Sequence, residues 1–214
     1  MRIAAIVPVK TFSKAKTRLN LSPQNKTELC KLMLDEVLNA ISDSMLIERI
    51  IVVTQDEAAL KISKKFNALT IYDNDESGVN NAVSLADSYL QKEGFDASVV
   101  FPQDIPFILS NDINILLKLQ NSSKYVGVVP SRKFDGTNAL VRKPVQIMET
   151  HYDEDSYKIH LNLGKSLTQN SSLILIRRIM LDIDYPDDLA ILNTYDEKPQ
   201  FCEKIRNLCD YTSL

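Results

Sequence analysis

Two aspartates late in the sequence have a spacing that suits a metal ion. Asp182 and Asp184 follow an apolar run over residues 173–179. Side chains two residues apart in an extended chain point the same way, so both carboxylates face one side and Ile183 faces the other. Such a pair repels unless a cation lies between, and Mg²⁺ prefers one or two carboxylates plus substrate phosphates. The pair predicts a magnesium or manganese site, although Asp184 could instead cap a helix beginning at Pro186.

Asp104 is a third candidate ligand. It follows an apolar run over residues 97–101 and lies between Pro102 and Pro106. A carboxylate at the carboxyl end of a strand, restrained by prolines on both sides, is suited to a divalent metal. The alternative is a turn or helix cap, which aspartate often provides. We expect Asp104 to complete the metal site and to be a catalytic residue.

A basic loop follows the first apolar run, residues 3–9. Four cations fall within nine residues: Lys10, Lys14, Lys16 and Arg18. The glycines of a phosphate-binding loop are absent, but lysine supplies a point charge and arginine a planar fork that matches phosphate. A solvated basic loop is the alternative. Because the loop follows a strand, it predicts a site for the phosphates of a nucleotide.

Two further segments could hold an anion. The Asp-Gly pair at 135–136 is a turn signal, but backbone amides around a glycine can approach an anion and the Thr137 hydroxyl adds a donor. Ser156 fits the start of a helix, with His160 one turn later on the same face. The alternatives are a plain hairpin and a plain helix cap with a surface histidine. His151 and His160 lack the third ligand that zinc would need.

The elements that position these residues alternate between strand-like and helix-like patterns. Alternation predicts one α/β domain over residues 1–214, with a mostly parallel sheet, helices on both faces and one antiparallel strand in the irregular second half. Ligands in such sheets bind beyond the carboxyl ends of the strands. The expected strands are 3–9, 49–54, 69–72, 97–101, 125–130, 139–142 and 173–179. The expected helices begin near Pro23 and Pro186 and cover 56–66, 79–90, 110–120, 144–152, 157–169 and 199–209.

The bulk properties exclude several classes of protein. A net charge of −3 over 214 residues argues against nucleic-acid binding. No apolar run is long enough to span a membrane, and the first strand is too short to be a signal peptide, so we expect a cytoplasmic protein. Cys30, Cys202 and Cys209 have no metal-site spacing and are expected to be packing residues. Apolar residues near Phe201 and Ile205 could pack internally or form a homodimer seam.

Taken in order, these motifs resemble the 2-phospho-L-lactate guanylyltransferases of deazaflavin coenzyme biosynthesis, over about residues 3–193. The residues that carry the resemblance are Pro8-Val9-Lys10, Ala15-Lys16-Thr17-Arg18-Leu19, Asp104-Ile105-Pro106, Gly136-Thr137-Asn138-Ala139-Leu140, Ser156 with His160, and Asp182-Ile183-Asp184-Tyr185-Pro186-Asp187-Asp188-Leu189.

The resemblance implies a three-layer nucleotidyltransferase fold of the glycosyltransferase-A type, related to molybdenum-cofactor guanylyltransferases. It implies transfer of GMP from GTP to the phosphate of 2-phospho-L-lactate, or of phosphoenolpyruvate in bacterial relatives, with release of pyrophosphate. Asp104, Asp182 and Asp184 would be metal ligands, and Thr137 and Ser156 would contact the acceptor. Asp153 stands where the family tends to have glycine.

Together the residues and the resemblance give a working hypothesis. The acceptor phosphate is already anionic, so catalysis rests on positioning and charge neutralisation without a general base. The residues expected to bind nucleotide are Pro8, Lys10, Lys14, Lys16, Arg18, Ser77 and Asn80, of which Lys10, Lys16 and Arg18 are also expected to act in catalysis. The residues expected at the acceptor are Gly136, Thr137, Asn138, Asp153, Ser156 and His160. The alternatives are transfer to a sugar phosphate or molybdopterin, and a nucleotide-binding module without catalysis.

Overall fold

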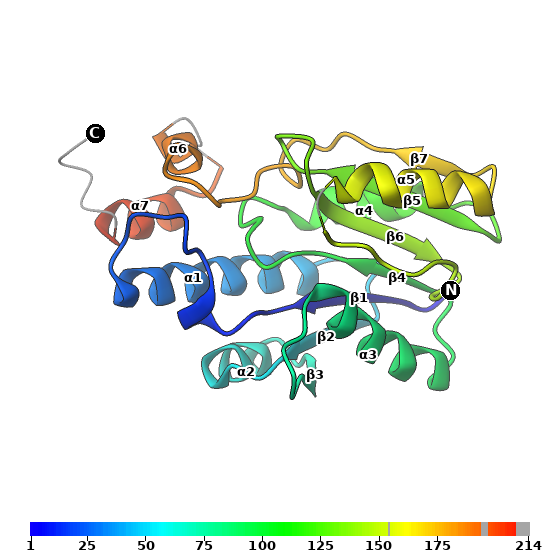
Figure 1. Cartoon of the computed structure of the whole chain (residues 1–214), viewed down its shortest axis with the longest axis horizontal. Helices are drawn as coiled ribbons and strands as arrows, with labels where there is room; N and C mark the ends of the chain where they lie inside the picture. The colour runs from blue at the N-terminus through cyan, green and yellow to red at the C-terminus, as the bar shows by residue number, and fades with distance from the viewer. Residues whose placement is uncertain (154, 194–196, 209–214) are drawn as a thin grey trace.

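A computed structural model describes residues 1–153, 155–193 and 197–208 and contains one seven-stranded sheet (Figure 1). The strands, in the spatial order β3-β2-β1-β4-β6-β5-β7, are β1 (Ile3–Pro8), β2 (Arg49–Thr54), β3 (Leu69–Tyr72), β4 (Ala97–Val100), β5 (Tyr125–Pro130), β6 (Thr137–Lys143) and β7 (Ser171–Leu173). The helices are α1 (Pro23–Ser42), α2 (Glu57–Lys65), α3 (Val79–Lys92), α4 (Ser110–Lys118), α5 (Ser156–Leu167), α6 (Pro186–Leu189) and α7 (Pro199–Leu208), with short 3₁₀ helices η1 (Phe12–Lys14) and η2 (Ala190–Asn193).

The helices cover both faces of the sheet, as the alternating pattern predicts. One core, called the main core below, contains Ala5 and Val7 of β1 together with buried side chains of α1, α2, α4 and α7. The other contains Ala4 and Ile6 together with side chains of α3 and α5. Because successive side chains of a strand point to opposite faces, the apolar run of β1 contributes to both cores.

The sheet is mixed because β6 runs antiparallel to both of its neighbours, β4 and β5. Pairings β1–β2, β1–β4, β2–β3 and β5–β7 are parallel. The predicted antiparallel strand is therefore confirmed. The carboxyl ends of β1 and β4, which are neighbours, bring the basic loop and Asp104 to one edge.

The predicted strand over residues 173–179 is wrong for most of its length, since β7 ends at Leu173. After one further pairing of the Ile174 amide with Val128, the chain turns, and the amides of Ile179 and Met180 both bond to the carbonyl of Ile176. The apolar pattern has another cause, because Ile179 is part of the main core.

The predicted helix over residues 144–152 is also wrong, because this segment contains turns, bends and irregular backbone but no helix. Val145 and Met148 are buried, which accounts for the apolar pattern. Two backbone amides that a helix would use bond to side chains instead: the His151 amide to His160 and the Tyr152 amide to Asn80.

The last helix and the apolar residues near it pack inside the molecule. Phe201 and Ile205 of α7 belong to the main core, so internal packing accounts for them without a dimer seam. Cys30 and Cys202 are buried, as expected, whereas residue 209, the predicted end of this helix, lies outside the described residues. In the described part of the chain, no helix combines the length and apolar character needed to cross a bilayer.

A buried ion pair fixes β6 to α3. Arg142 Nη1 and Nη2 donate to the two carboxylate oxygens of Asp87 at 2.7 and 2.6 Å, and Nη2 also donates to Ser98 Oγ at 3.0 Å. Burial raises the pKa of Asp87, and the guanidinium of Arg142 opposes the rise. Loss of one partner would leave the other charge buried and uncompensated.

We therefore predict that Asp87→Asn lowers the free energy of unfolding by about 3 kcal/mol. Asp35→Asn is the matched control, because Asp35 pairs with Lys65 in an exposed helix–helix ion pair and its loss should cost under about 1 kcal/mol. Urea denaturation of both variants measures the difference. Equal stability losses would contradict the structural role of the buried pair.

Candidate functional site

Three neighbouring cavities lie at the carboxyl edge of the sheet, and Asp104 lines all of them. The cation cavity, about 280 Å³, is lined by Lys10, Lys14, Ala15, Lys16, Thr17, Arg18, Gln103, Asp104 and Asp184. The β3 cavity, about 430 Å³, includes Pro8, Val9, Lys10, Val53, Asp73, Glu76, Ser77, Val79 and Asn80. The α5 cavity, about 730 Å³, includes Arg18, Asp135, Gly136, Thr137, Asn138, Tyr152, Asp153, Asp155, Ser156, Asp182, Asp184 and Tyr185.

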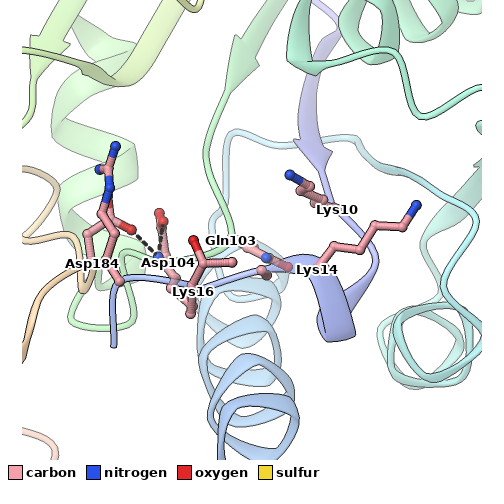
Figure 2. A pocket seen from close by; sticks show the side chains of 9 residues that line it. Lys10, Lys14, Lys16, Gln103, Asp104 and Asp184 are labelled. Atoms are coloured by element: carbon pink, nitrogen blue, oxygen red, sulfur yellow. Dashed lines mark hydrogen bonds and ion pairs between the residues drawn. The ribbon is translucent and has the colours of Figure 1, made fainter. Parts of the chain in front are cut away.

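Lys16 joins two of the predicted metal ligands (Figure 2). Its Nζ donates to Asp184 Oδ1 at 2.6 Å and also to Asp104 Oδ2. Burial alone would lower the pKa of Lys16, but the two carboxylates outweigh it and raise the pKa above its ordinary value, so the side chain is charged at neutral pH. Lys16 has φ 53°, which costs a non-glycine residue on the order of 1 kcal/mol, and its two ion pairs offset that strain.

Asp182 lines the α5 cavity beside Asp104 and Asp184 and is partly buried. Burial and the charge of Asp104 raise its pKa to about 6, against a hydrogen bond from Asn138. Asn138 Nδ2 donates to Asp182 Oδ1 at 3.1 Å and to the Ile179 carbonyl at 3.0 Å. Asn138, which is predicted to bind the acceptor, lines the α5 cavity, but its side-chain amide group donates to Asp182 and holds that carboxylate in place.

The three aspartates all line the α5 cavity. Asp104 lies beyond the carboxyl end of β4, as predicted, whereas Asp182 and Asp184 do not follow a strand, because β7 ends at Leu173. Ile183 between two of them is buried in the main core, so the alternating geometry predicted for 182–184 is confirmed. Oxygen ligands around a net negative charge fit the chemistry of Mg²⁺. Across residues 1–153, 155–193 and 197–208, however, no three histidine, cysteine, aspartate or glutamate side chains are arranged to hold a metal. The metal site therefore stays a prediction.

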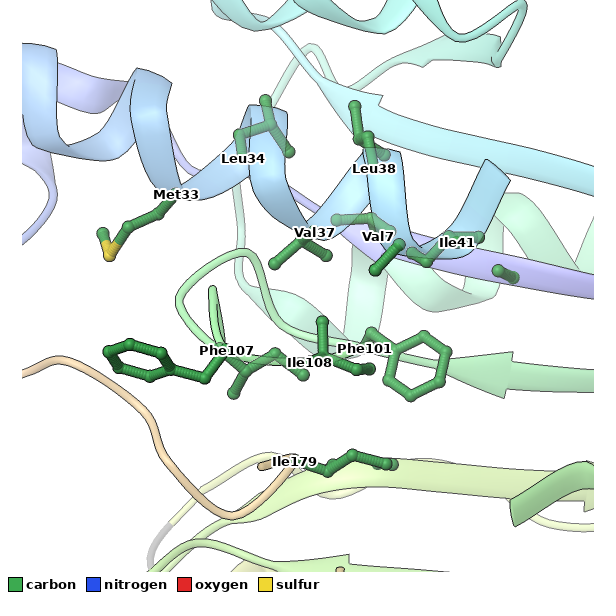
Figure 3. Close-up of a cluster of buried hydrophobic side chains, with 14 of the residues drawn as sticks. Val7, Met33, Leu34, Val37, Leu38, Ile41, Phe101, Phe107, Ile108 and Ile179 are labelled. Atoms are coloured by element: carbon green, nitrogen blue, oxygen red, sulfur yellow. The ribbon is translucent and has the colours of Figure 1, made fainter. Parts of the chain in front are cut away.

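Residues next to the three aspartates in sequence pack in the main core and hold the site in place. Val37 of α1, Phe101 and Ile108 beside Asp104, and Ile179 upstream of Asp182 pack in one cluster (Figure 3). Above this cluster the amide of Ile183 donates to the carbonyl of Asp104 at 3.0 Å. The two acidic segments therefore keep a fixed separation although they are far apart in sequence.

The other cations of the basic loop have different surroundings. Lys14 Nζ donates to Glu76 Oε2 at 2.6 Å, so the Glu76 carboxylate neutralises the charge of Lys14. Lys10 is exposed and borders both the cation cavity and the β3 cavity. The guanidinium of Arg18 lies 5.2 Å from the ring centre of Tyr185, at the boundary between the cation cavity and the α5 cavity. The structure thus brings all four predicted cations to one cavity.

The β3 cavity brings together Pro8, Ser77 and Asn80, which are predicted to bind the nucleotide. It also contains an aspartate that the sequence reasoning missed. Asp73 is 5% exposed, and its Oδ1 accepts from the Glu76 amide at 3.2 Å and from Asn81 Nδ2 at 3.3 Å. It directly follows β3, so the rule that selected Asp104 could also have selected Asp73.

His160 lies behind the α5 cavity, not in it. The side chain is fully buried, so the surface histidine considered as an alternative is wrong, and so is direct contact with an acceptor. Its Nδ1 lies 2.9 Å from Thr137 Oγ1, and its Nε2 accepts from the His151 amide at 2.8 Å. Burial, with smaller contributions from His151 and Arg142, lowers the pKa of His160 to about 3. The ring is therefore neutral at neutral pH.

Thr137 and Ser156, which are predicted to bind the acceptor, line the α5 cavity. The Gly136 amide, predicted to meet an anion, donates to Ser131 Oγ at 3.1 Å and closes the β5–β6 turn instead. Asp153 is exposed and lines both this cavity and the β3 cavity, where it adds negative charge.

Solved structures define the class of fold. A Desulfovibrio desulfuricans G20 chain described as a nucleotide-diphospho-sugar transferase superimposes over 100% of both chains with a TM-score of 0.74 at 13% identity. A cytidylyltransferase from Leptospira borgpetersenii superimposes with a TM-score of 0.61 at 13% identity, over 100% of this chain and 99% of that one. The chain therefore has the α/β nucleotidyltransferase fold.

Sequence comparison defines the family. The family model described as "Guanylyl transferase CofC like" matches residues 3–209. The phosphoenolpyruvate guanylyltransferase of Conexibacter woesei is 31% identical, covering 90% of this chain and 87% of its own. The 2-phospho-L-lactate guanylyltransferase of Methanobrevibacter smithii is 28% identical, covering 96% of this chain and 90% of its own. The chain belongs to the CofC-like guanylyl transferase family.

The lowered pKa of His160 predicts an acid-sensitive contribution to stability. The unfolded chain takes up a proton on this histidine near pH 6.5, whereas the folded protein does not, so acidification favours unfolding. Between pH 7 and pH 5 this contribution should cost about 2 kcal/mol in the wild type and nothing in His160→Gln. Urea denaturation at both pH values measures it. The same loss in both proteins would contradict a buried neutral ring.

Proposed function

We propose that this protein transfers GMP from GTP to the phosphate of a phosphorylated three-carbon acid, 2-phospho-L-lactate or phosphoenolpyruvate, and releases pyrophosphate. The observation that carries the proposal is the position of Asp104, which borders all three cavities. Family membership and the names of the relatives in Conexibacter woesei and Methanobrevibacter smithii support the nucleotide and the acceptor class.

The nucleotide fits across two of the cavities. In the β3 cavity, Val9 and Val53 offer apolar walls to a base, and Asp73 and Asn80 offer polar groups to its edge. Lys10 stands where that cavity meets the cation cavity, so the triphosphate of the same nucleotide would extend along Lys10, Lys16 and Arg18. These side chains would neutralise the charge that develops as pyrophosphate departs.

The aspartates support a role for magnesium. Mg²⁺ on Asp104, Asp182 and Asp184 would draw negative charge away from the reacting phosphates. Asp104 and Asp184 already attract one cation, the Lys16 ammonium, which occupies the space between them. Lys16 also lines the cation cavity, where its charge would face the triphosphate.

The acceptor fits the α5 cavity. Its phosphate, ionised at neutral pH, would attack the α-phosphorus of GTP without a general base. Thr137 and Ser156 would hold the acceptor, and Arg18 at the boundary with the cation cavity would face its charge. His160 is neutral and outside the cavity, which agrees with a reaction that needs no proton transfer from the acceptor.

A pyrophosphate-release assay tests the proposed function. We expect release with GTP plus 2-phospho-L-lactate or phosphoenolpyruvate, weaker release with ATP, CTP or UTP, and loss of release on removal of divalent metal by a chelator. Lactate, which lacks the phosphate, is the matched control acceptor. Release that is independent of the acceptor's phosphate would overturn the proposal.

The role of Asp104 gives a separate prediction. Asp104→Asn keeps the shape and can still accept a hydrogen bond from Lys16, but it removes the charge that all three cavities share. Its kcat should fall about 10²-fold or more while its thermal melt stays close to wild type. Asp35→Asn removes the exposed ion pair with Lys65, which lines none of the three cavities, and should keep wild-type activity. Substantial activity in the Asp104 variant would remove this carboxylate from the reaction.

A further inference from the structure

A chain of hydrogen bonds runs from the backbone of residue 151 to the wall of the α5 cavity. The His151 amide donates to His160 Nε2 at 2.8 Å, His160 Nδ1 lies 2.9 Å from Thr137 Oγ1, and Ser156 Oγ donates to Thr137 Oγ1 at 3.1 Å. The Thr137 and Ser156 side chains line the cavity although each residue is over 90% buried. The chain therefore ends at the cavity surface.

The direction of the His160–Thr137 bond follows from the bond between the His151 amide and His160. A backbone N–H can only donate, so Nε2 of His160 must be the unprotonated nitrogen. A neutral imidazole carries its proton on the other nitrogen, and burial keeps this ring neutral. Nδ1–H therefore donates to Thr137 Oγ1.

The hydroxyl of Thr137 can then make one further hydrogen bond, as a donor. A hydroxyl oxygen accepts at two lone pairs, and here His160 and Ser156 use both. Its own hydrogen is left to donate, and the cavity that it borders is where the acceptor is proposed to bind. The ring of Tyr152, edge-on to His160 at 4.9 Å between ring centres, holds the imidazole in this orientation.

We infer that His160 is a positioning residue that fixes the Thr137 hydroxyl as a hydrogen-bond donor toward an anionic oxygen of the acceptor. The inference rests on the proposed function for the identity of the acceptor. It also explains why a histidine that never touches the cavity is buried one helical turn behind Ser156. Without the Nδ1–H donor, the Thr137 hydroxyl is free to turn its hydrogen toward the protein and present only lone pairs to an anion.

A mutant cycle tests this role. Gln at position 160 keeps an acceptor for the His151 amide but has no donor at the place of Nδ1, whereas Asn places an amide donor near the place of Nδ1. We expect His160→Gln to raise the KM for the acceptor acid about tenfold and to leave the KM for GTP within twofold. His160→Asn should recover most of the acceptor affinity. Thr137→Val should match His160→Gln in its effect on the acceptor.

The double variant Thr137→Val/His160→Gln separates this role from a general structural one. If His160 acts through Thr137, the double variant should bind the acceptor no worse than Thr137→Val alone. Three results would overturn the inference. The first is a double variant whose acceptor KM rises about a hundredfold, the product of the two single effects. The others are an unchanged acceptor KM in His160→Gln and equal rises in its KM values for the acceptor and for GTP.

A second measurement needs no variant and no turnover. Long-range ¹H–¹⁵N correlation spectra of the wild-type protein report which nitrogen of His160 carries the proton. We expect the Nδ1–H form at pH 7, and an Nε2–H or doubly protonated ring would overturn the inference. Transfer of GMP by the wild type tests the proposed function separately, so a failure of either can be distinguished from a failure of the other.

Discussion

The ammonium group of Lys16 lies between two carboxylates from opposite halves of the chain. Asp104 follows the central strand β4, and Asp184 lies in the segment between β7 and α6. Two carboxylates this close would repel each other, so the lysine charge is what allows them to face the same space. The three cavities meet at this cluster, and the packing of Ile179 and Ile183 beneath it keeps the late segment in place.

This arrangement gives each segment a separate task. In the proposed function, the cavity beside β3 would take the base and the basic loop would face the phosphates. Thr137 of β6 and Ser156 of α5 would hold the acid. Asp104 lines all three cavities, so the proposed transfer of a nucleotide to a second phosphate would occur beside it. The chemistry depends on charges held in position more than on any group that exchanges protons.

Much of the fold and part of the site can be read from the sequence. The strand-end rule found Asp104 and the basic loop, and the period of two found Asp182 and Asp184, because both depend on local geometry. Sequence reasoning failed at residues 144–152, where side chains outside the segment, those of His160 and Asn80, accept hydrogen bonds from two of its backbone amides. It also failed for His160, because helical spacing shows which residues share a face but not what covers that face. The ion pairs of Lys16 were not predicted, because its partners Asp104 and Asp184 lie 88 and 168 residues away in the sequence.

The central claim is that the acceptor's phosphate attacks the α-phosphorus of GTP at this site. Its most direct test is a mass spectrum of the products formed from GTP and an acceptor acid carrying ¹⁸O at the three non-ester oxygens of its phosphate. The account predicts a guanylylated acid that retains all the label and pyrophosphate that contains none. Label in pyrophosphate, or a product that carries the β-phosphate of GTP, would contradict it.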